Sequence, residues 1–271
     1  MIITKLCGGL GNQLFQWAAA KNVAVKYDTD VLCDLSHFGS CKAIRTEDRI
    51  KEVGESRITP WGLELDKVLN GLEFVDGNVH SLRPVNEASQ CRTLEDNTYL
   101  TGFWQSETYF AENADEIRFD LKLSHIEKNA LKSLYPFIED NTVSVHVRRG
   151  DYVNLQHMHP CQTVEYYDKA LEFIGEFSNI LVFSDDINWC KENFKYNNMH
   201  FAEGQDNVTD LYTMSLCSHN VIANSSFSWW GAWLNENPSK KVVAPSYWFA
   251  NGTTSENIIP KNWIKYDNIM F

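Results

Sequence analysis

The sequence has no long hydrophobic run and little positive charge. No stretch of about 18 apolar residues occurs among its 271 positions, so no segment is a candidate membrane-spanning helix. Lysine and arginine total 24 against 36 aspartates and glutamates, which gives a net charge of −12. This balance argues against a nucleic-acid partner and against general adhesion to anionic membranes. An anionic small molecule would therefore need a local basic site.

Cysteines are few and irregularly spaced. There are seven, an odd number, and no two of them have the C-x-x-C spacing. This pattern predicts neither a disulfide framework nor a zinc site, and a reducing cytoplasm is the simplest setting. The apolar segment after Lys5 resembles a short signal peptide, but Asn12, Gln13 and Gln16 interrupt it. We therefore expect a cytoplasmic protein that associates at most peripherally with the inner membrane.

The strongest signal that is present lies at 143–152, which reads V-S-V-H-V-R-R-G-D-Y. Valines alternate with other residues, which predicts a strand, and the strand breaks at Arg148-Arg149-Gly150-Asp151. Two adjacent arginines suit a phosphate or pyrophosphate there, because a guanidinium matches phosphate oxygens bidentately. The alternative is a surface arginine pair in a salt bridge with Asp151. The hydrophobic strand that leads in favours the anion site.

Strands and helices alternate along most of the chain, which predicts an α/β fold. A strand at 2–7, a helix at 12–27 and a strand at 31–34 open the chain as a βαβ unit, whereas 36–98 predict only loops and short elements. A second series begins with the strand at 143–148 and predicts a doubly wound domain, which binds ligands at the carboxyl ends of its strands. A helix with a capping box precedes it at 124–135. The link at 139–141 separates an N-terminal domain, 1–139, from a C-terminal domain, 140–271.

A glycine-rich turn, G-G-L-G-N-Q at 8–13, follows the first strand. Backbone amides at a helix N-terminus bind anions or sugar hydroxyls, which makes Gly9, Gly11, Asn12 and Gln13 candidates for sugar contacts. The alternative is a dinucleotide fingerprint, since Gly9-Leu10-Gly11 follows a strand. Leu14 occupies the position of the third glycine, which argues against nicotinamide binding.

Two further polar segments follow predicted strands. The carboxylates of Asp185 and Asp186 can accept from the ring N–H and exocyclic amine of guanine, or one of them can cap the next helix. Neither this pair nor 28–30, D-T-D, has a further ligand at a helpful spacing, so we expect no metal site. At 224–234, small polar residues open a helix and offer donors to a phosphate, and Trp229, Trp230 and Trp233 are expected to be core.

In this order the segments resemble the bacterial type of α-1,2-fucosyltransferase in glycosyltransferase family 11. The matching stretches cover nearly the whole chain and include G-G-L-G-N-Q-L-F-Q at 8–16, G-F-W-Q-S-E-T-Y-F at 102–110, H-V-R-R-G-D-Y at 146–152, F-S-D-D at 183–186 and the segment 210–234. Residues 36–98 match least. The resemblance implies a GT-B fold, in which two Rossmann-like domains with parallel sheets face each other across a cleft.

The resemblance also implies an inverting transfer of L-fucose from GDP-β-L-fucose to the 2-hydroxyl of a terminal β-galactose on a glycan acceptor. GDP-fucose would bind mainly to the C-terminal domain and the acceptor mainly to the N-terminal one, with no cofactor and no metal ion. Arg148 or Arg149 would stabilise the departing pyrophosphate, helped by Ser225, Ser226 and the amide of Phe227.

Other roles are expected for single residues. The donor-binding set comprises His146, Asp185, Asp186, Asn224, Ser225, Ser226 and Phe227. His146 is expected at the ribose or phosphate, or else as a buried structural histidine, and Asp185 at guanine. Asn12 would contact fucose or the reacting region. Asp151 is either the general base or a salt-bridge partner that orients the arginines, and the weaker candidates for the base are His157 and His159. A dissociative reaction would need no strong base.

Three other functions remain to be distinguished. A nicotinamide-dependent oxidoreductase would leave the arginine pair and the segment 224–234 unexplained. A catalytically silent glycan-binding protein is disfavoured because Arg148, Arg149 and Asp151 are all present. A fucosyltransferase that forms another linkage would share H-x-R-R-G-D, whereas the longer S-S-F-S-W-W-G-A-W favours the 1,2 linkage.

Overall fold

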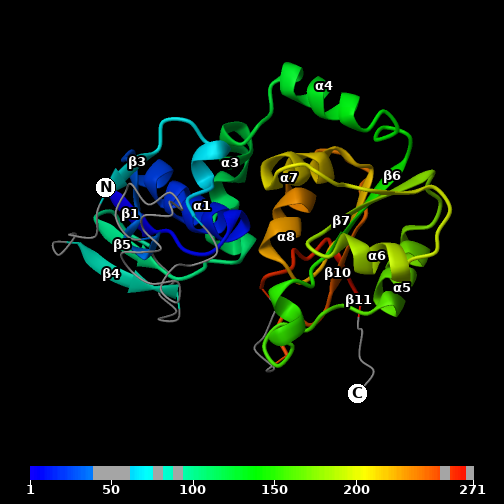
Figure 1. The fold of residues 1–271 in the computed structure, drawn as a ribbon. Coiled ribbons are helices and arrows are strands. Elements are labelled where there is room, and N and C mark those ends of the chain that lie inside the picture. Colours follow the sequence, from blue (N-terminus) through cyan, green and yellow to red (C-terminus); the bar gives the residue numbers. More distant parts are fainter. Residues whose placement is uncertain (39–61, 76–81, 88–93, 251–256, 267–271) are drawn as a thin grey trace, which may run out of the picture. The chain divides into compact units, whose positions relative to one another are not determined.

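The computed structural model describes residues 1–38, 62–75, 82–87, 94–250 and 257–266 (Figure 1). The chain folds into two compact units, Met1–Lys122 and Leu123–Phe271. The sequence placed the boundary farther along the chain, at 139–140, and so assigned the helix before it to the first domain. The structure assigns this helix to the second unit.

The helix that accounts for this difference is α4 (His125–Leu134), which contacts α7 (Asn207–Leu216). An ion pair between Lys128 and Glu236, at 2.9 Å, also ties α4 to the second unit. The predicted capping box is present: the Ser124 hydroxyl accepts from the Glu127 N–H, and the Glu127 carboxylate accepts from the Ser124 N–H. Local capping was readable from the sequence, but the packing partner was not.

The first unit contains a five-stranded parallel sheet in the order β3-β2-β1-β5-β4. Its strands are β1 (Ile2–Lys5), β2 (Val31–Asp34), β3 (Glu73–Val75), β4 (Arg83–Asn86) and β5 (Thr98–Thr101), and its helices include α1 (Leu10–Tyr27) and α3 (Ala114–Asp120). The predicted βαβ unit is confirmed as β1, α1 and β2. The strands β3 and β4 lie within the segment predicted as loops and short elements. Both are short and largely exposed, with Val85 as their only buried residue, so neither carries a hydrophobic strand pattern.

The second unit contains a six-stranded parallel sheet in the order β11-β10-β9-β6-β7-β8. Its strands are β6 (Thr142–Val147), β7 (Asn179–Ser184), β8 (Met199–Phe201), β9 (His219–Val221), β10 (Val242–Pro245) and β11 (Ile264–Tyr266). Besides α4 and α7, its helices are α5 (Val164–Ile174), α6 (Ile187–Asn193) and α8 (Ser226–Trp233). The doubly wound series is confirmed. The unpredicted strands β8 and β11 are three-residue strands at the two edges of the sheet.

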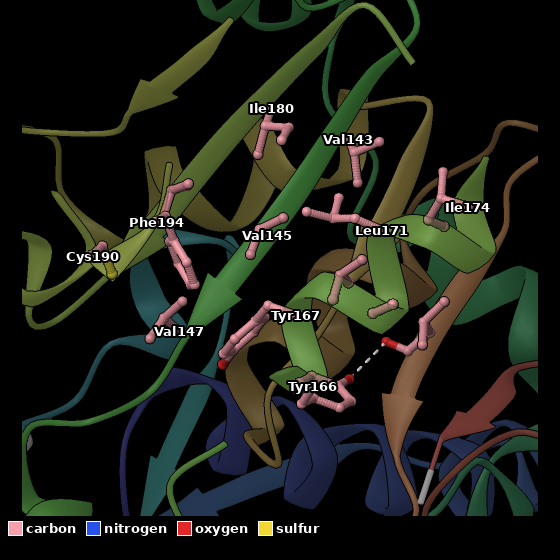
Figure 2. Packing of buried hydrophobic residues seen from close by; sticks show 14 residues of the cluster. Val143, Val145, Val147, Tyr166, Tyr167, Leu171, Ile174, Ile180, Cys190 and Phe194 are labelled. Atoms are coloured by element: carbon pink, nitrogen blue, oxygen red, sulfur yellow. Dashed lines mark hydrogen bonds between the residues drawn. The ribbon is translucent and has the colours of Figure 1, made fainter. Parts of the chain in front are cut away.

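The central strand β6 is buried along its whole length and carries different side chains on its two faces. Its three valines pack against Tyr166 and Tyr167 of α5 (Figure 2). Ser144 and His146 point to the opposite face, where the Asn220 amide donates to the Ser144 hydroxyl at 2.7 Å. Figure 1 shows α7 and α8 on one side of this sheet and α5 and α6 on the other. His146 therefore lies on the face that α7 and α8 cover.

Aromatic packing fixes α8 against its unit. Trp229, Trp230 and Trp233 are 0–2% exposed, which confirms the prediction that they are core residues. The indole N–H of Trp229 donates to the Ile258 carbonyl at 2.8 Å. Because the whole helix is anchored in this way, the position of its N-terminus is also fixed.

Candidate active site

Three of the predicted segments meet at the carboxyl edge of the sheet in the second unit. The strands β9, β6 and β7 are neighbours there, and their ends lead into 222–225, 148–151 and 185–186. The structure thus brings together the arginine pair, the aspartate pair and the turn before α8. Doubly wound sheets bind their ligands at this edge.

Arg148 lies between two carboxylates on the α8 side of the site. Its guanidinium pairs with Asp151 and, through Nη1, with Asp185 Oδ2 at 2.7 Å. It also lies over the Tyr152 ring, 5.1 Å from the centroid. The Tyr152 hydroxyl in turn donates to the Asn224 carbonyl at 3.2 Å. Tyr152 therefore places Arg148 beside the turn that leads from β9 into α8.

Arg149 has its partners on the opposite side. Its Nε donates to Asp186 Oδ2 at 3.1 Å, and its guanidinium lies 4.1 Å above the ring of Trp189 on α6. Trp189 packs against the core that α5 shares with β6, which is the face opposite α7 and α8. The two arginines are adjacent in the sequence but are held on different sides of the sheet.

Asp185 is engaged through both of its carboxylate oxygens. Its Oδ1 accepts from the Arg149 backbone N–H at 2.8 Å, and its Oδ2 pairs with Arg148. Asp186 caps α6, as predicted for one of the two aspartates, by accepting from the Trp189 N–H at 3.2 Å. The contact between Asp185 and guanine stays a prediction, and it would have to compete with both arginines.

Gly150 allows Asp185 to approach the arginine loop. A Cβ added at Gly150 would lie 2.4 Å from Asp185 Oδ2, far inside van der Waals contact. We expect Gly150→Ala to push Asp185 away from Arg148 and to destabilise the fold by roughly 1–3 kcal/mol. Chemical denaturation measures this loss. The matched control is Gly62→Ala, because a Cβ there meets no described atom within 4 Å. Equal stability of the two variants would contradict the packing role.

His146 is buried and neutral. Burial, and then the charge of Arg148, lower the pKa of His146 to about 3. Its Nδ1 is buried and has no hydrogen-bond partner in the described part of the chain. Its ring lies 5.6 Å from that of Phe227, the second residue of α8. The burial fits a structural histidine, whereas the unpartnered nitrogen fits a ligand contact, so the predicted contact remains a prediction.

The turn before α8 is held by Asn224. The Asn224 amide donates to the Trp248 carbonyl at 3.1 Å and accepts from the Gln162 amide at 3.1 Å. The Asn224 side chain therefore stabilises the turn itself. Ser225 follows as the N-cap of α8, in an extended conformation and with no side-chain capping bond within that helix. The positive end of the helix dipole lies at Ser226 and Phe227, beside His146, which favours an anion at this edge.

Asp151 forms the salt bridge with Arg148 that the sequence offered as one of its two roles. His159 stacks on Tyr152 with a centroid distance of 4.7 Å, and burial lowers the pKa of His159, so its ring is neutral at pH 7. His157 is exposed. Asp151 and His159 thus lie on either side of the Arg148–Tyr152 pair.

Asp210 is a candidate that the sequence reasoning missed. It lies in the first turn of α7, and its Oδ1 is buried without a partner in the described residues. Burial, and then the nearby Asp206, raise the pKa of Asp210 to about 6. One helical turn later, Met214 packs in the cluster that Phe227 contacts, so Asp210 lies on the same face of the sheet as His146. The sequence signal that could have identified Asp210 is its position four residues before Met214, because residues at this spacing lie on the same face of a helix.

Gln13 of the first unit was predicted to contact sugar, and the structure corrects this. It is 0% exposed, and its amide is saturated by backbone groups. Its oxygen accepts from two N–H groups and its nitrogen donates to two carbonyls, which belong to Glu64 and Leu65 and to Gly8 and Gly62. A glutamine amide has no further capacity. Gln13 therefore ties the turn to 62–65, because its position on α1 faces the core.

The neighbouring residues of the glycine-rich turn also have structural roles. Gly9 is the N-cap of α1, and Gly11 is buried within that helix. The Leu10 N–H donates to Glu64 Oε2 at 2.8 Å, so a carboxylate stands where the pyrophosphate of a dinucleotide would bind. This argues against the nicotinamide alternative. Asn12 accepts from the Gln105 amide at 2.7 Å, and its contact with sugar stays a prediction.

Three further observations concern only the described residues. They contain no group of three or more His, Cys, Asp or Glu side chains placed to hold a metal ion. None of their helices combines the length and apolarity that crossing a membrane requires. The cysteines among them are free thiols, namely Cys7, Cys33, Cys161, Cys190 and Cys217.

Comparison with known sequences adds to this geometry. The family described as Glycosyl transferase family 11 matches residues 85–267. An α-1,2-colitosyltransferase of Escherichia coli is 31% identical over 98% of this chain and 99% of its own length. The O-antigen biosynthesis glycosyltransferase WbnK of Escherichia coli is 30% identical over 96% of this chain and 98% of its own length. A galactoside α-(1,2)-fucosyltransferase 1 of Bos taurus is 30% identical over 50% of this chain and 43% of its length.

Comparison with solved structures concerns the fold. The crystal structure of POFUT1 in complex with GDP has a TM-score of 0.53 and 13% sequence identity, over 90% of this chain and 97% of that one. At this identity the likeness bears on the fold alone. Together with the two parallel sheets, it confirms the predicted GT-B fold class.

Proposed function

The chain belongs to glycosyl transferase family 11, and on that premise we propose the reaction that its site performs. L-Fucose is transferred from GDP-β-L-fucose to the 2-hydroxyl of a terminal β-galactose on a glycan acceptor, with inversion at the anomeric carbon. No metal ion and no cofactor take part. The observation that carries this proposal is a guanidinium, that of Arg148, held beside the N-terminus of α8 at the carboxyl edge of the sheet.

In the proposed step, the bond between fucose C1 and the β-phosphate oxygen breaks, and its electron pair leaves with GDP. The acceptor 2-oxygen bonds to C1 from the opposite face and loses its proton. Negative charge grows on the pyrophosphate while the sugar takes on oxocarbenium character. Donors that are already fixed stabilise this charge without reorganising, which is the largest contribution in many enzymes.

Arg148 is the donor best placed for this charge. Asp185 and Tyr152 hold it on the α8 side, and the Tyr152 hydroxyl binds the Asn224 carbonyl, one residue before the N-cap of α8. We propose that the hydroxyls of Ser225 and Ser226 and the amide of Phe227 assist it. Arg149 positions the loop, because Asp186 and Trp189 hold its side chain on the α6 side. The sequence left the choice between the two arginines open, and we assign the pyrophosphate to Arg148.

We assign the guanine base to Asp210, with His146 beside it. Guanine presents its ring N–H and its 2-amino group side by side, and a carboxylate can accept from both. Asp210 has a buried oxygen without a partner in the described residues, whereas both oxygens of Asp185 already bind the arginine loop. Asp185 is the alternative that the sequence favoured.

The acceptor proton goes to Asp151 or to His159. Both lie next to Arg148 or Tyr152, and burial lowers the pKa of His159, which favours the neutral imidazole that a base needs. Asp151 also neutralises Arg148, so its removal would affect the donor site as well.

A second candidate donor is GDP-colitose. The α-1,2-colitosyltransferase of Escherichia coli resembles this chain over nearly its whole length, and colitose differs from fucose only by lacking the 3-hydroxyl. The phosphate and guanine contacts described above would serve either donor. The two donors therefore have to be separated by rates.

Turnover of the two donors on methyl β-D-galactoside, in the presence of EDTA, tests the proposal. We expect kcat/KM for GDP-fucose to exceed that for GDP-colitose by about tenfold or more, as for a site that hydrogen-bonds the extra hydroxyl. Nuclear magnetic resonance of the product is expected to show an α-1,2 linkage. Faster transfer of colitose would favour the second donor, and another linkage would replace the 1,2 assignment. No product from either donor would overturn the proposed function.

A further inference from the structure

An exposed aromatic side chain stands at the carboxyl edge of the sheet in the first unit. The strand β5 ends at Thr101, and 102–106 form the loop that follows. In this loop Phe103 is 48% exposed, while its neighbour Trp104 is 1% exposed and packs edge-on against Tyr109. Trp104 anchors the loop in the core, and Phe103 is presented to solvent.

The backbone of this loop is tightly fixed. One carboxylate oxygen of Glu87 accepts from the N–H groups of Phe103 and Trp104, at 2.9 and 2.8 Å. A Cβ on Gly102 would lie 2.6 Å from the Glu87 Cβ, and Gly102 has a φ of +134°. Trp104 has a φ of +55°, a left-handed conformation that strains any residue other than glycine. The backbone that carries the exposed ring is thus held in one conformation by contacts that outweigh local strain.

Side-chain amides connect the loop that carries this ring to α1. Gln105 donates to Asn12 Oδ1 at 2.7 Å, and Gln16 donates to the Gly102 carbonyl at 3.1 Å. These bonds join the loop after β5 to the first turns of α1, the helix that follows β1, and β1 is the neighbour of β5 in the sheet. Among the described residues, the bond to Asn12 is the only hydrogen bond of the Gln105 side chain, so its carbonyl oxygen remains available.

A pyranose ring matches this combination of groups. One face of galactose is formed by C–H groups and packs on an aromatic ring, while its hydroxyls need donors and acceptors at the rim. We propose that Phe103, with the amides of Asn12 and Gln105, forms the subsite for the terminal galactose of the acceptor. This inference rests on the proposed function and adds to it the residues that select the acceptor.

Steady-state kinetics of Phe103→Ala and Phe103→Trp test the subsite. With GDP-fucose saturating, Phe103→Ala is expected to raise the KM for methyl β-D-galactoside about tenfold or more, because the apolar face of the sugar loses its platform. Phe103→Trp keeps an aromatic surface and is expected to stay near the wild-type KM. The matched control is Phe119→Ala, which removes a phenylalanine that is 73% exposed in the same unit. The KM for GDP-fucose is expected to be unchanged in all three.

Direct binding separates this inference from the proposed function. Saturation-transfer NMR with methyl β-D-galactoside is expected to detect binding to the wild type and to Phe119→Ala, and none to Phe103→Ala. If the wild type binds the galactoside through Phe103 but transfers no fucose, the subsite stands and the proposed function fails. If Phe103→Ala binds and uses the galactoside as well as the wild type does, or if the wild type does not bind it, the inference is overturned.

Discussion

Arg148→Ala is expected to lower kcat by about 10²–10³, the loss seen when a single transition-state donor is removed from an enzyme. The guanidinium of Arg148 is fixed by Asp185 and Tyr152 on the side of the sheet where α8 begins. In the proposed reaction, it is the donor that meets the charge on the departing pyrophosphate. Measured with saturating substrates, kcat reports this loss directly. Arg148→Lys is expected to recover little, since an ammonium cannot make two parallel hydrogen bonds.

Arg149→Ala is the control for this prediction. Its side chain lies on Trp189 and binds Asp186, so its removal is expected to lower the melting temperature and to affect kcat much less than Arg148→Ala does. Equal losses of kcat in the two variants would remove the distinction between them. If kcat falls by less than about tenfold in both variants, the arginine pair does not stabilise the transition state as proposed.

Asp210→Asn is expected to stabilise the fold at pH 7 and above. The pKa of Asp210 is about 6 in the folded chain, against an ordinary value of 3.8, so the folded chain keeps a proton that the unfolded chain releases. The stability that this group contributes is therefore present below about pH 4 and is lost as the pH rises through 6. A shift of about two pKa units corresponds to a loss of stability of about 3 kcal/mol at most. Asparagine carries no charge, so the substitution is expected to restore that stability.

Denaturation of the wild type and Asp210→Asn at pH 4, 6 and 8 measures the effect. We expect a gain in the free energy of unfolding that is near zero at pH 4 and largest at pH 8. Glu203→Gln, which alters an exposed carboxylate of the same unit, is expected to show no such trend. A gain that is constant with pH would mean that Asp210 is not desolvated.

The same substitution tests recognition of the base. Inosine diphosphate lacks the 2-amino group of guanine, so a site that binds this group discriminates against it. We expect the wild type and Asp185→Asn to prefer GDP over inosine diphosphate, and Asp210→Asn to lose that preference. If Asp185→Asn loses the preference instead, the guanine contact expected from the sequence is the right one.

Local patterns predicted the elements of the site well. The alternation of valines in 143–147 placed β6, and its abrupt end placed the arginine pair at the carboxyl edge of a parallel sheet. The capping box of α4 and the buried tryptophans of α8 were equally local, because capping and hydrophobicity depend on a few neighbouring residues. The edge strands β8 and β11 were not predicted, because three residues are too few to show the alternation of hydrophobic and polar residues that indicates a strand.

Partners distant in the sequence could not be predicted. Arg148 and Arg149 are adjacent in the chain, and their side chains have different partners only because Asp185 and Trp189 lie on different sides of the strand. Gln13 was assigned to sugar because its residue type suits hydroxyls, but its helix turns it into the core. Asp210 reads as an ordinary first-turn carboxylate in the sequence, and only the packing of α7 shows that one of its oxygens is buried.

Release of GDP from GDP-fucose, measured in the presence of EDTA, tests the central claim most directly. The wild type and Arg148→Ala would be compared with and without methyl β-D-galactoside. We predict rapid release by the wild type that depends on the galactoside, and a rate about 10²–10³ lower for Arg148→Ala. Release that requires a divalent metal, or that is equally fast in Arg148→Ala, would contradict a donor site built around this arginine.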